Sequence, residues 1–228
     1  MFCHRCGAQV GDVAFCPSCR QPLTKVAGGS AASLTWTAPQ GVQAASGRWL
    51  GEAWNLVMAD LGSYVVITVL FMLLSSIPFI QGALIAGFHI YTIKKLTGRN
   101  PQIGDYFQGF NFFLATLLAT IVIGFFTFLG TLALIIPGLV IAAMYKFTYL
   151  FIVDKRMDFW QAMQASHAVV KNDYFGFTMF LILAFLVNVL GALCLFVGLL
   201  VTIPMTFAAI TIAYREIVGF EPRTAGSL

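Results

Sequence analysis

Charged residues are scarce in this sequence. Asp, Glu, Lys and Arg make up 10% of the 228 residues, whereas hydrophobic residues make up 59%. An ordinary soluble domain carries roughly 25% charged residues. So few charges cannot cover the surface of a soluble domain of this length, and a chain this apolar is not intrinsically disordered. The composition therefore predicts a membrane protein.

Three long stretches contain no charged residue at all: residues 61–93, 106–145 and 174–214. They are 33, 40 and 41 residues long, each near twice the length of about 20 residues that a membrane helix needs. Each is interrupted near its middle by proline or glycine, which favours a turn there. The pattern predicts an all-α membrane bundle over residues 47–219, with about six transmembrane helices arranged as three hairpins.

The first hairpin is the shortest of the three. Allowing for a turn, it offers about 15 residues per helix, or roughly 23 Å, against a hydrocarbon core of about 30 Å. Two alternatives follow from this length. Either residues 49–60 extend the first helix, or the hairpin enters the bilayer without fully spanning it.

Basic residues mark the ends of the hairpins, and the hairpin turns carry none. By the positive-inside rule, the basic side of the bundle is cytoplasmic, so we expect both termini in the cytoplasm, including a tail at residues 220–228. The first 20 residues are polar and rich in cysteine, unlike a signal peptide. We therefore expect a multi-pass protein of a cytoplasmic (inner) membrane. Basic residues that fall before, between or after the hairpins include Arg48, Lys94, Lys95, Arg99, Lys155, Arg156, Lys171, Arg215 and Arg223.

Four of the five cysteines lie within the first 19 residues. Cys3, Cys6, Cys16 and Cys19 form two Cys-x-x-Cys pairs separated by nine residues. Two such pairs place four thiolates around one ion in the tetrahedral geometry that zinc prefers, and they leave no open position for a catalytic water. The spacing predicts a zinc ribbon over residues 1–23 with one structural zinc ion. Two disulfides are the alternative, and the expected cytoplasmic location disfavours them.

The ribbon is expected to act as a tethered module. A segment of about 22 residues has too little apolar surface to fold unaided, so zinc binding and folding should occur together. Residues 24–46 are rich in Ala, Gly, Ser, Thr and Gln and predict a flexible linker with a reach of about 25 to 30 Å. The ribbon is weakly basic and lacks interleaved aromatic residues, which favours a cytoplasmic protein over nucleic acid as its partner.

A motif of Asp, two aromatic residues, Gln, a small residue and a large apolar residue precedes two of the hairpins. It occupies residues 105–110 and 158–163, and residues 49–54 hold a weaker version before the first hairpin. Asp followed three residues later by Gln is a variant of the capping box. We therefore expect Asp105 and Asp158 to be N-caps of amphipathic helices at the membrane interface. A short cytoplasmic helix packed on the bundle is the alternative for the segment after Asp158.

The second halves of the hairpins also resemble one another. Each begins with Ile-Pro and runs through small and apolar residues to a tyrosine followed by basic residues. A tyrosine in that position is typical of the interfacial aromatic belt. The sequence therefore predicts three structural repeats, and chance similarity among apolar segments is the alternative. The three tyrosines are Tyr91, Tyr149 and Tyr214.

No carboxylate lies inside a hairpin, which disfavours proton- or sodium-coupled transport and metal-dependent lipid chemistry. A candidate membrane polar site remains, formed by His89, Lys146 and Asn188. His89 would be a structural histidine or, with a nearby serine, part of a hydrolase. Lys146 would bind a phosphate headgroup, line a pore, or extend its ammonium to the inner leaflet. Asn188 would join two helices or bind a ligand.

Two regions carry a resemblance to known families. The Cys-x-x-Cys-Gly ending at Gly7 resembles the N-terminal ribbon of bacterial zinc-ribbon membrane proteins with an uncharacterised multi-pass domain, although Arg20 follows Cys19 where glycine is common. Residues 136–219 resemble a bacterial superfamily that includes the membrane domain of some glycerophosphoryl diester phosphodiesterases. The matching residues are Ile136-Pro137-Gly138, Gln161-Ala162-Met163 with Ser166 and Val170-Lys171, and Ile203-Pro204 through Tyr214 to Gly219. This resemblance implies a bacterial membrane domain without established catalytic residues.

These features together predict a non-enzymatic integral membrane scaffold or adaptor. Its short hairpins would shape or sense the lipid bilayer, and its ribbon would recruit a cytoplasmic protein. Spaced pairs of small residues would allow tight helix contacts within the chain or in self-association. A channel or a lipid or small-molecule permease is the alternative function, and an intramembrane enzyme is the least favoured class. The small-residue pairs are Gly82/Ala86, Ala83/Gly87 and Ala209/Ala213.

Overall fold

The computed structural model describes residues 36–194 and 196–221. The chain divides into two compact parts, Met1–Thr37 and Ala38–Leu228, and the C-terminal part contains the hairpins. The four expected zinc ligands, the first part of the expected linker and residues 222–228 of the expected tail lie outside the described residues.

The described residues form an all-helical domain, which confirms the all-α part of the predicted fold class. The α-helices are α1 (Ser46–Met58), α2 (Leu61–Leu74), α3 (Gln81–Leu96), α4 (Phe113–Ala133), α5 (Ile135–Met144), α6 (Thr148–Lys155), α7 (Phe159–Val170), α8 (Tyr174–Leu193) and α9 (Leu199–Ile217). Two 3-10 helices accompany them, η1 (Pro78–Ile80) and η2 (Ile103–Phe112).

The order of elements repeats three times along the chain. Each unit consists of a leading element, an outward helix and a return helix. The first unit is α1, α2 and α3; the second is η2, α4 and α5 with α6; the third is α7, α8 and α9. The outward and return helices match the uncharged stretches 61–93 and 174–214 in the first and third units, whereas the stretch 106–145 begins within η2 and ends before α6. The order of elements therefore agrees with the three predicted repeats, with an additional break in the second return helix.

Both motif aspartates take part in side-chain capping, and one of them does so at a position that differs from the prediction. Asp158 is the N-cap of α7, where its side chain accepts a hydrogen bond of 2.8 Å from the backbone N–H of Gln161. Asp105 is not an N-cap. Because η2 begins at Ile103, Asp105 is its third residue and accepts from the backbone N–H of Gln102 at 2.8 Å, which completes a capping box.

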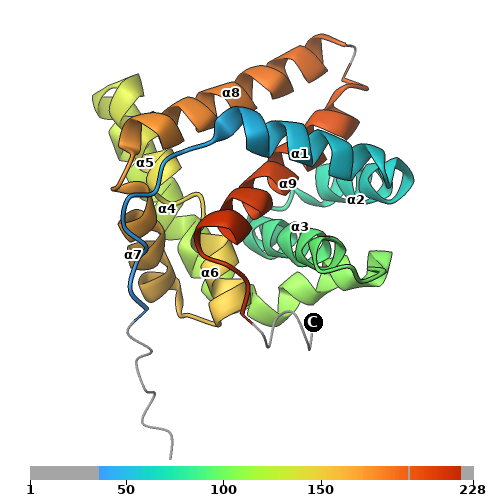
Figure 1. Cartoon of the computed structure of the whole chain (residues 1–228), viewed down its shortest axis with the longest axis horizontal. Coiled ribbons are helices and arrows are strands. Elements are labelled where there is room, and N and C mark those ends of the chain that lie inside the picture. Colours follow the sequence, from blue (N-terminus) through green and yellow to red (C-terminus); the bar gives the residue numbers. More distant parts are fainter. Residues whose placement is uncertain (1–35, 195, 222–228) are drawn as a thin grey trace, which may run out of the picture. The chain divides into compact units, whose positions relative to one another are not determined.

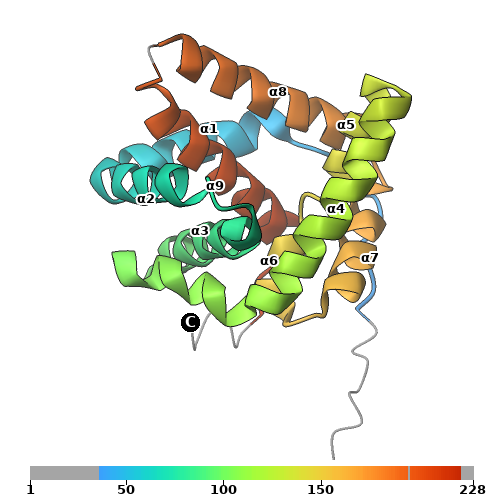
Figure 2. The ribbon, with the colours of Figure 1, turned by 180° about the vertical axis from the view of Figure 1, so that it is seen from behind.

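The three units interlock in a closed ring. The return helix of each unit packs against the leading element of the next: α3 against η2, α6 against α7, and α9 against α1. Figures 1 and 2 show α3, α6 and α9 in the middle of the domain and the outward helices α2, α4 and α8 around them. A small buried residue lies in each leading element, and these are Ala53, Gly109 and Ala162.

Glycines permit the closest of these contacts. A Cβ atom at Gly87 of α3 would overlap the carbonyl oxygen of Tyr106 in η2, and one at Gly109 would overlap the carbonyl oxygen of Ala83. A Cβ atom at Gly82 would overlap Thr116 and Thr120 of α4. The small-residue pairs of α3 therefore serve contacts within the chain. The pair Ala209/Ala213 of α9 is likewise fully buried.

The number of candidate membrane spans is lower than the six predicted. Four segments are long and apolar enough to cross a membrane, by length and composition, and α1 with α2 would add a fifth if counted as one bent span. The axes of α1 and α2 differ by 101°, so α1 is not a straight extension of α2. The return helix α3 has only 16 residues, most of them buried by protein. The four segments are Ile103–Ala133, Ile136–Lys155, Tyr174–Leu193 and Leu199–Ile217.

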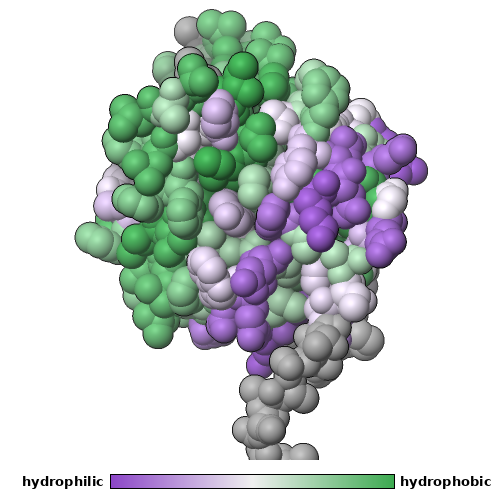
Figure 3. Space-filling model, turned by 90° about the vertical axis from the view of Figure 1, so that its left-hand side faces the viewer, coloured by the Kyte–Doolittle hydropathy of each residue, from purple (hydrophilic) through white to green (hydrophobic). Residues whose placement is uncertain are grey.

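Hydrophilic and hydrophobic residues occupy different sides of the domain. In Figure 3, hydrophobic residues fill one side of the view and hydrophilic residues form a band on the other. The outward helices supply much of the exposed apolar surface, with Phe128 of α4 65% exposed and Phe185 of α8 65% exposed. Aromatic and aliphatic side chains exposed over that area are suited to contact with lipid rather than water.

The segment before α1 is attached to the third unit. The backbone N–H of Ala44 donates to the Asp173 carboxylate at 3.1 Å, and the Asn172 amide donates to the Pro39 carbonyl at 3.3 Å. Asp173 also caps α8 by accepting from the N–H of Gly176 at 2.8 Å. The C-terminal end of the expected 24–46 linker is thus held against the corner between α7 and α8.

Candidate functional site

The predicted metal site lies outside the described residues, because all four of its cysteines precede residue 36. Within the described part of the chain, no group of three or more His, Cys, Asp or Glu side chains is placed to hold a metal ion. Cys194, an exposed free thiol after α8, is the one cysteine that the structure describes.

His89 lies in α3 and is 1% exposed. Its Nδ1 is 2.8 Å from the Thr211 hydroxyl of α9, and the Phe207 ring packs edge-on against the imidazole. The Thr211 hydroxyl donates its one hydrogen to the Phe207 carbonyl at 2.9 Å. It must therefore accept from His89, which assigns the hydrogen to Nδ1. These are the surroundings of a structural histidine that joins two return helices.

The hydrolase alternative requires a serine beside His89. Ser75 instead ends α2, where its hydroxyl donates to the Met72 carbonyl at 3.0 Å. Ser76 is exposed in the turn that follows. Neither hydroxyl makes a hydrogen bond to His89 in the part of the chain that the structure describes.

Asn188 joins α8 to α9. Its amide nitrogen donates to the Thr206 hydroxyl at 2.7 Å and to the Ala184 carbonyl at 2.8 Å. Its amide oxygen is buried without a hydrogen bond, as is the hydroxyl of Thr202 one turn before Thr206. The polar contact therefore links the two helices of the third hairpin while leaving acceptor capacity unused.

Lys146 lies at the break between α5 and α6 and is half-buried. Among the described residues its ammonium forms no ion pair and no hydrogen bond. The break itself is stabilised by Ser166 of α7, whose hydroxyl donates to the Met144 carbonyl at 2.6 Å and accepts from the Phe147 N–H at 3.2 Å. The charge of Lys146 is within electrostatic range of His89.

Among the described residues, no hydrogen bond or ion pair joins the three predicted polar residues to one another. His89 and Asn188 contact α9 through Thr211 and Thr206, which are five residues, or about 7.5 Å, apart along the helix. No hydrogen bond or ion pair within residues 36–194 and 196–221 joins Lys146 to either side chain. Two of the three residues therefore serve helix packing, and Lys146 contributes only the electrostatic effect of its charge on His89.

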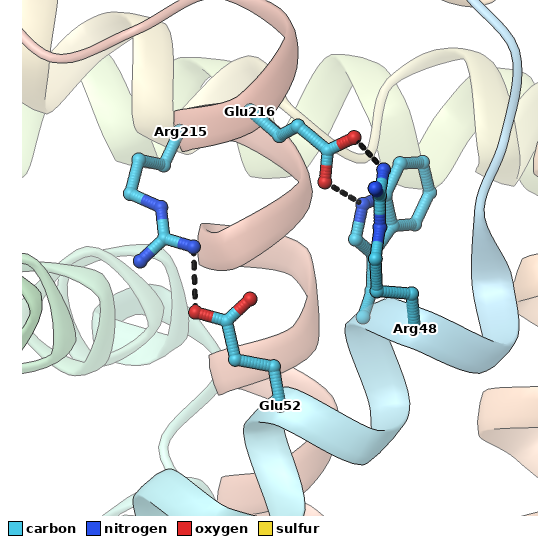
Figure 4. Close-up of polar contacts among 5 residues, drawn as sticks. Arg48, Glu52, Arg215 and Glu216 are labelled. Atoms are coloured by element: carbon cyan, nitrogen blue, oxygen red, sulfur yellow. Dashed lines mark hydrogen bonds and ion pairs between the residues drawn. The ribbon is translucent and has the colours of Figure 1, made fainter.

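A cluster of ion pairs, which the sequence did not predict, joins the first unit to the third (Figure 4). Arg48 and Glu52 project from α1 toward Arg215 and Glu216 of α9. Arg215 donates to Glu52 at 2.6 Å, and Arg48 pairs with Glu216. The Glu216 carboxylate also accepts from the indole N–H of the buried Trp49 at 2.8 Å. We call these five residues the α1–α9 clamp.

A second set of charges joins α3 to η2 and to the corner between α1 and α2. Lys94, with its side chain only 8% exposed, pairs with Asp105 at 2.9 Å. Lys95 pairs with Asp60 at 2.7 Å, and Tyr91 donates to the same carboxylate at 3.1 Å. Burial alone would raise the pKa of Asp60, but the hydrogen bonds from Lys95, Ser63 and Tyr91 outweigh it and hold that pKa below its usual value.

Two of the tyrosines expected in an interfacial belt are buried instead. Tyr91 and Tyr214 are both 0% exposed. Tyr214 donates to the buried Asp154 at 2.9 Å, as Tyr91 does to Asp60. Tyr149, the third, lies 3.0 Å from the Thr120 hydroxyl of α4. The belt prediction is therefore wrong for Tyr91 and Tyr214, because each phenol reaches a carboxylate from a distant part of the chain.

Comparison with known proteins gives no relative: no family model, no curated protein and no solved structure matches the chain.

Proposed function

We propose that this protein is a non-enzymatic membrane scaffold that shapes the lipid bilayer and self-associates in it. The observation that supports this most is the closed ring of three helical units, in which four basic residues pair with carboxylates of another unit or of the segment after α9. These residues are Lys94, Lys155, Arg48 and Arg215, whereas Lys95 pairs with Asp60 of its own unit. Such a ring, with an apolar surface on its outward helices, would suit a scaffold in the membrane.

The cysteine-rich N-terminus would supply the adaptor part of this function. We propose that Cys3, Cys6, Cys16 and Cys19 bind one structural zinc ion and form a ribbon that recruits a cytoplasmic protein. The resemblance to bacterial zinc-ribbon membrane proteins supports this proposal, as does the Cys-x-x-Cys spacing. Location in a bacterial inner membrane, with both termini in the cytoplasm, belongs to the same proposal. Nucleic acid is not the proposed partner.

Self-association would use the exposed faces of the outward helices. The small-residue pairs of α3 and α9 are occupied within the chain, so they are not available for contacts between subunits. The apolar surface of α4, with Phe125 58% exposed, is available.

The test is reconstitution of the full chain into liposomes of phosphatidylethanolamine and phosphatidylglycerol. Vesicle diameter is measured by electron cryomicroscopy and subunit contact by in-membrane cross-linking. We expect smaller or tubular vesicles and cross-linked multimers. A variant with Leu134→Asp and Val197→Asp, at two hairpin turns, should lose the effect on shape, whereas Gln164→Asp on the exposed polar side of α7 should keep it. A wild-type chain that stays monomeric and leaves vesicle shape unchanged contradicts the proposal.

A channel or permease is the second candidate, and Lys146 is the observation that favours it. A half-buried lysine within a candidate span, unpaired among the described side chains, is costly unless it faces water or an anion. We would measure anion and cation flux in the same liposomes, with Lys146→Met as the variant. Flux that the substitution abolishes would favour the permease over the scaffold.

A further inference from the structure

The hairpin turns expose large apolar side chains. Nine of them, three at each turn, are between 49% and 75% exposed. Charged side chains are missing from all three turns, since each lies in the middle of a stretch without Asp, Glu, Lys or Arg. The nine residues are Leu73, Ile77 and Phe79 at the first turn, Leu132, Leu134 and Ile136 at the second, and Leu193, Phe196 and Val197 at the third.

These turns are poorly suited to water on the far side of a membrane. A turn that emerges from the bilayer usually carries polar residues, and the helix ends beside it carry Trp, Tyr, Lys or Arg at the headgroup level. Here the described turn residues are Ser, Ile, Pro, Phe, Leu, Cys, Val and Gly. The aromatic residues present are Phe79 and Phe196, which lack the polar atom that Trp and Tyr bring to an interface.

The lengths and directions of the helices also indicate that the turns do not reach the far side of a membrane. The outward helix α2 has 14 residues, about 21 Å, against a hydrocarbon core of about 30 Å. The helices α4 and α8 are long enough to cross if upright, but they do not run parallel in Figures 1 and 2, and their turns lie at the two upper corners of the domain, well apart from each other. Two helices that diverge cannot both stand along one membrane normal, so at least one reaches less deep than its length allows.

We propose that the three hairpin turns end inside the hydrocarbon core, so that the domain is inserted from its polar side and does not cross the bilayer. The exposed side chains of the turns are then in contact with lipid acyl chains. The polar side, with its ion pairs, stays at the headgroups and in water. This inference deepens the scaffold proposal, because a splayed apolar wedge inserted from one side expands one leaflet more than the other.

Thiol accessibility tests the position of the turns directly. Cys194 already lies at the third turn, and Phe79→Cys and Leu134→Cys in a Cys194→Ser chain place a thiol at the other two. Full-length protein in vesicles of either orientation is treated with a membrane-impermeant maleimide, and the peptide that carries each position is analysed by mass spectrometry. Lys171→Cys, at the end of α7, is the matched control in the same chain and should be modified fully from the polar side.

We expect at least tenfold less modification at all three turns than at the control, from both faces. Modification of the turns from the face opposite to the control overturns the proposal, because it shows that the hairpins cross. Protection alone would also arise if a second copy covered the turns. Wild-type protein is therefore irradiated in vesicles containing a phospholipid with a diazirine near the end of its acyl chain. Lipid adducts on the turn peptides support the proposal, and cross-links to a second chain without lipid adducts overturn it.

These readouts do not depend on vesicle shape or subunit contact. A scaffold that crosses the membrane would fail the thiol test and still pass the reconstitution test.

Discussion

The contact between α3 and η2 provides the sharpest test of the ring. Gly87 of α3 lies so close to η2 that a methyl group would overlap the Tyr106 carbonyl oxygen, which is backbone and cannot rotate away. Gly51 of α1 is also inside a helix, but an added methyl group there meets nothing within 4 Å. The two positions therefore separate the effect of the close contact from the effect of alanine in a helix.

We expect Gly51→Ala to stabilise the domain by up to about 1 kcal/mol, because alanine is the better helix former. Gly87→Ala gains the same intrinsic amount and must move η2 away from α3. Overpacking of this kind usually costs about 1 to 3 kcal/mol, and the overlap with backbone places this case at or above the upper end. We therefore expect a net loss of about 2 kcal/mol or more, and a difference of roughly 3 kcal/mol between the two variants.

The assay is reversible unfolding in mixed micelles by titration with a denaturing detergent, followed by tryptophan fluorescence. Thermal unfolding gives a second measure, with a shift of about 2 to 4 °C for each kcal/mol in a domain of this size. If Gly87→Ala is as stable as Gly51→Ala, the close packing of α3 on η2 is refuted, and the closed ring with it.

Three other changes test the charges and the metal. Glu52→Arg in the α1–α9 clamp should cost about 1 kcal/mol or less, because both partners are more than a third exposed, and adding Arg215→Glu should recover the loss in the same unfolding assay. The pKa of Asp60 is lowered in the folded domain, so its contribution to stability is present above its unfolded pKa and is lost as the pH falls through the folded value. Asp60→Asn should therefore reduce the dependence of the unfolding free energy on pH over that range. An unchanged slope of the unfolding free energy against pH would contradict the assignment. The purified full chain should carry one zinc by elemental analysis, Cys6→Ser should lose it, and Cys194→Ser should retain it; equal zinc in both variants would rule out the ribbon ligand set.

Local features of the sequence predicted the helices well. Absence of charge over 33 to 41 residues and the central Pro and Gly breaks are properties of neighbouring residues, so they report hairpins without knowledge of the fold. The Asp158 cap was predicted for the same reason, since its partner is three residues away. Asp105 was assigned wrongly as an N-cap because η2 begins earlier, where Gln102 and Asp105 bond reciprocally.

The remaining contacts depend on residues far apart in the chain. Tyr91 and Tyr214 have basic residues nearby in sequence, which is the pattern of an interfacial belt, yet their hydroxyls bond to carboxylates 31 and 60 residues away. The α1–α9 clamp could not be predicted from local sequence for the same reason, because Arg215 and Glu52 are 163 residues apart. In the sequence, Lys94 and Arg215 served only as indicators of membrane topology. In the structure they also join one unit to the next.

The bend between α1 and α2 follows from these distant contacts. Asp60 lies at the bend itself, and Glu52 lies in α1 about two turns before it. With the 101° bend, Asp60 is beside Lys95 of α3 and Glu52 is beside Arg215 of α9. The two carboxylates therefore bond to different return helices, and Ala59 and Asp60 are the two residues between α1 and α2.

Ring closure also determines the order in which this domain can be completed. The α3–η2 contact joins segments that are close in the chain, so it can form early. The last interface that synthesis makes available is that of α1 with α9, because α1 begins at Ser46 and α9 ends at Ile217. Until α9 is made, Trp49 lacks the Glu216 carboxylate that accepts from its indole N–H. The first unit, with the shortest outward helix, therefore completes its contacts only when the last unit is present, and the interface of α1 with α9 closes the ring.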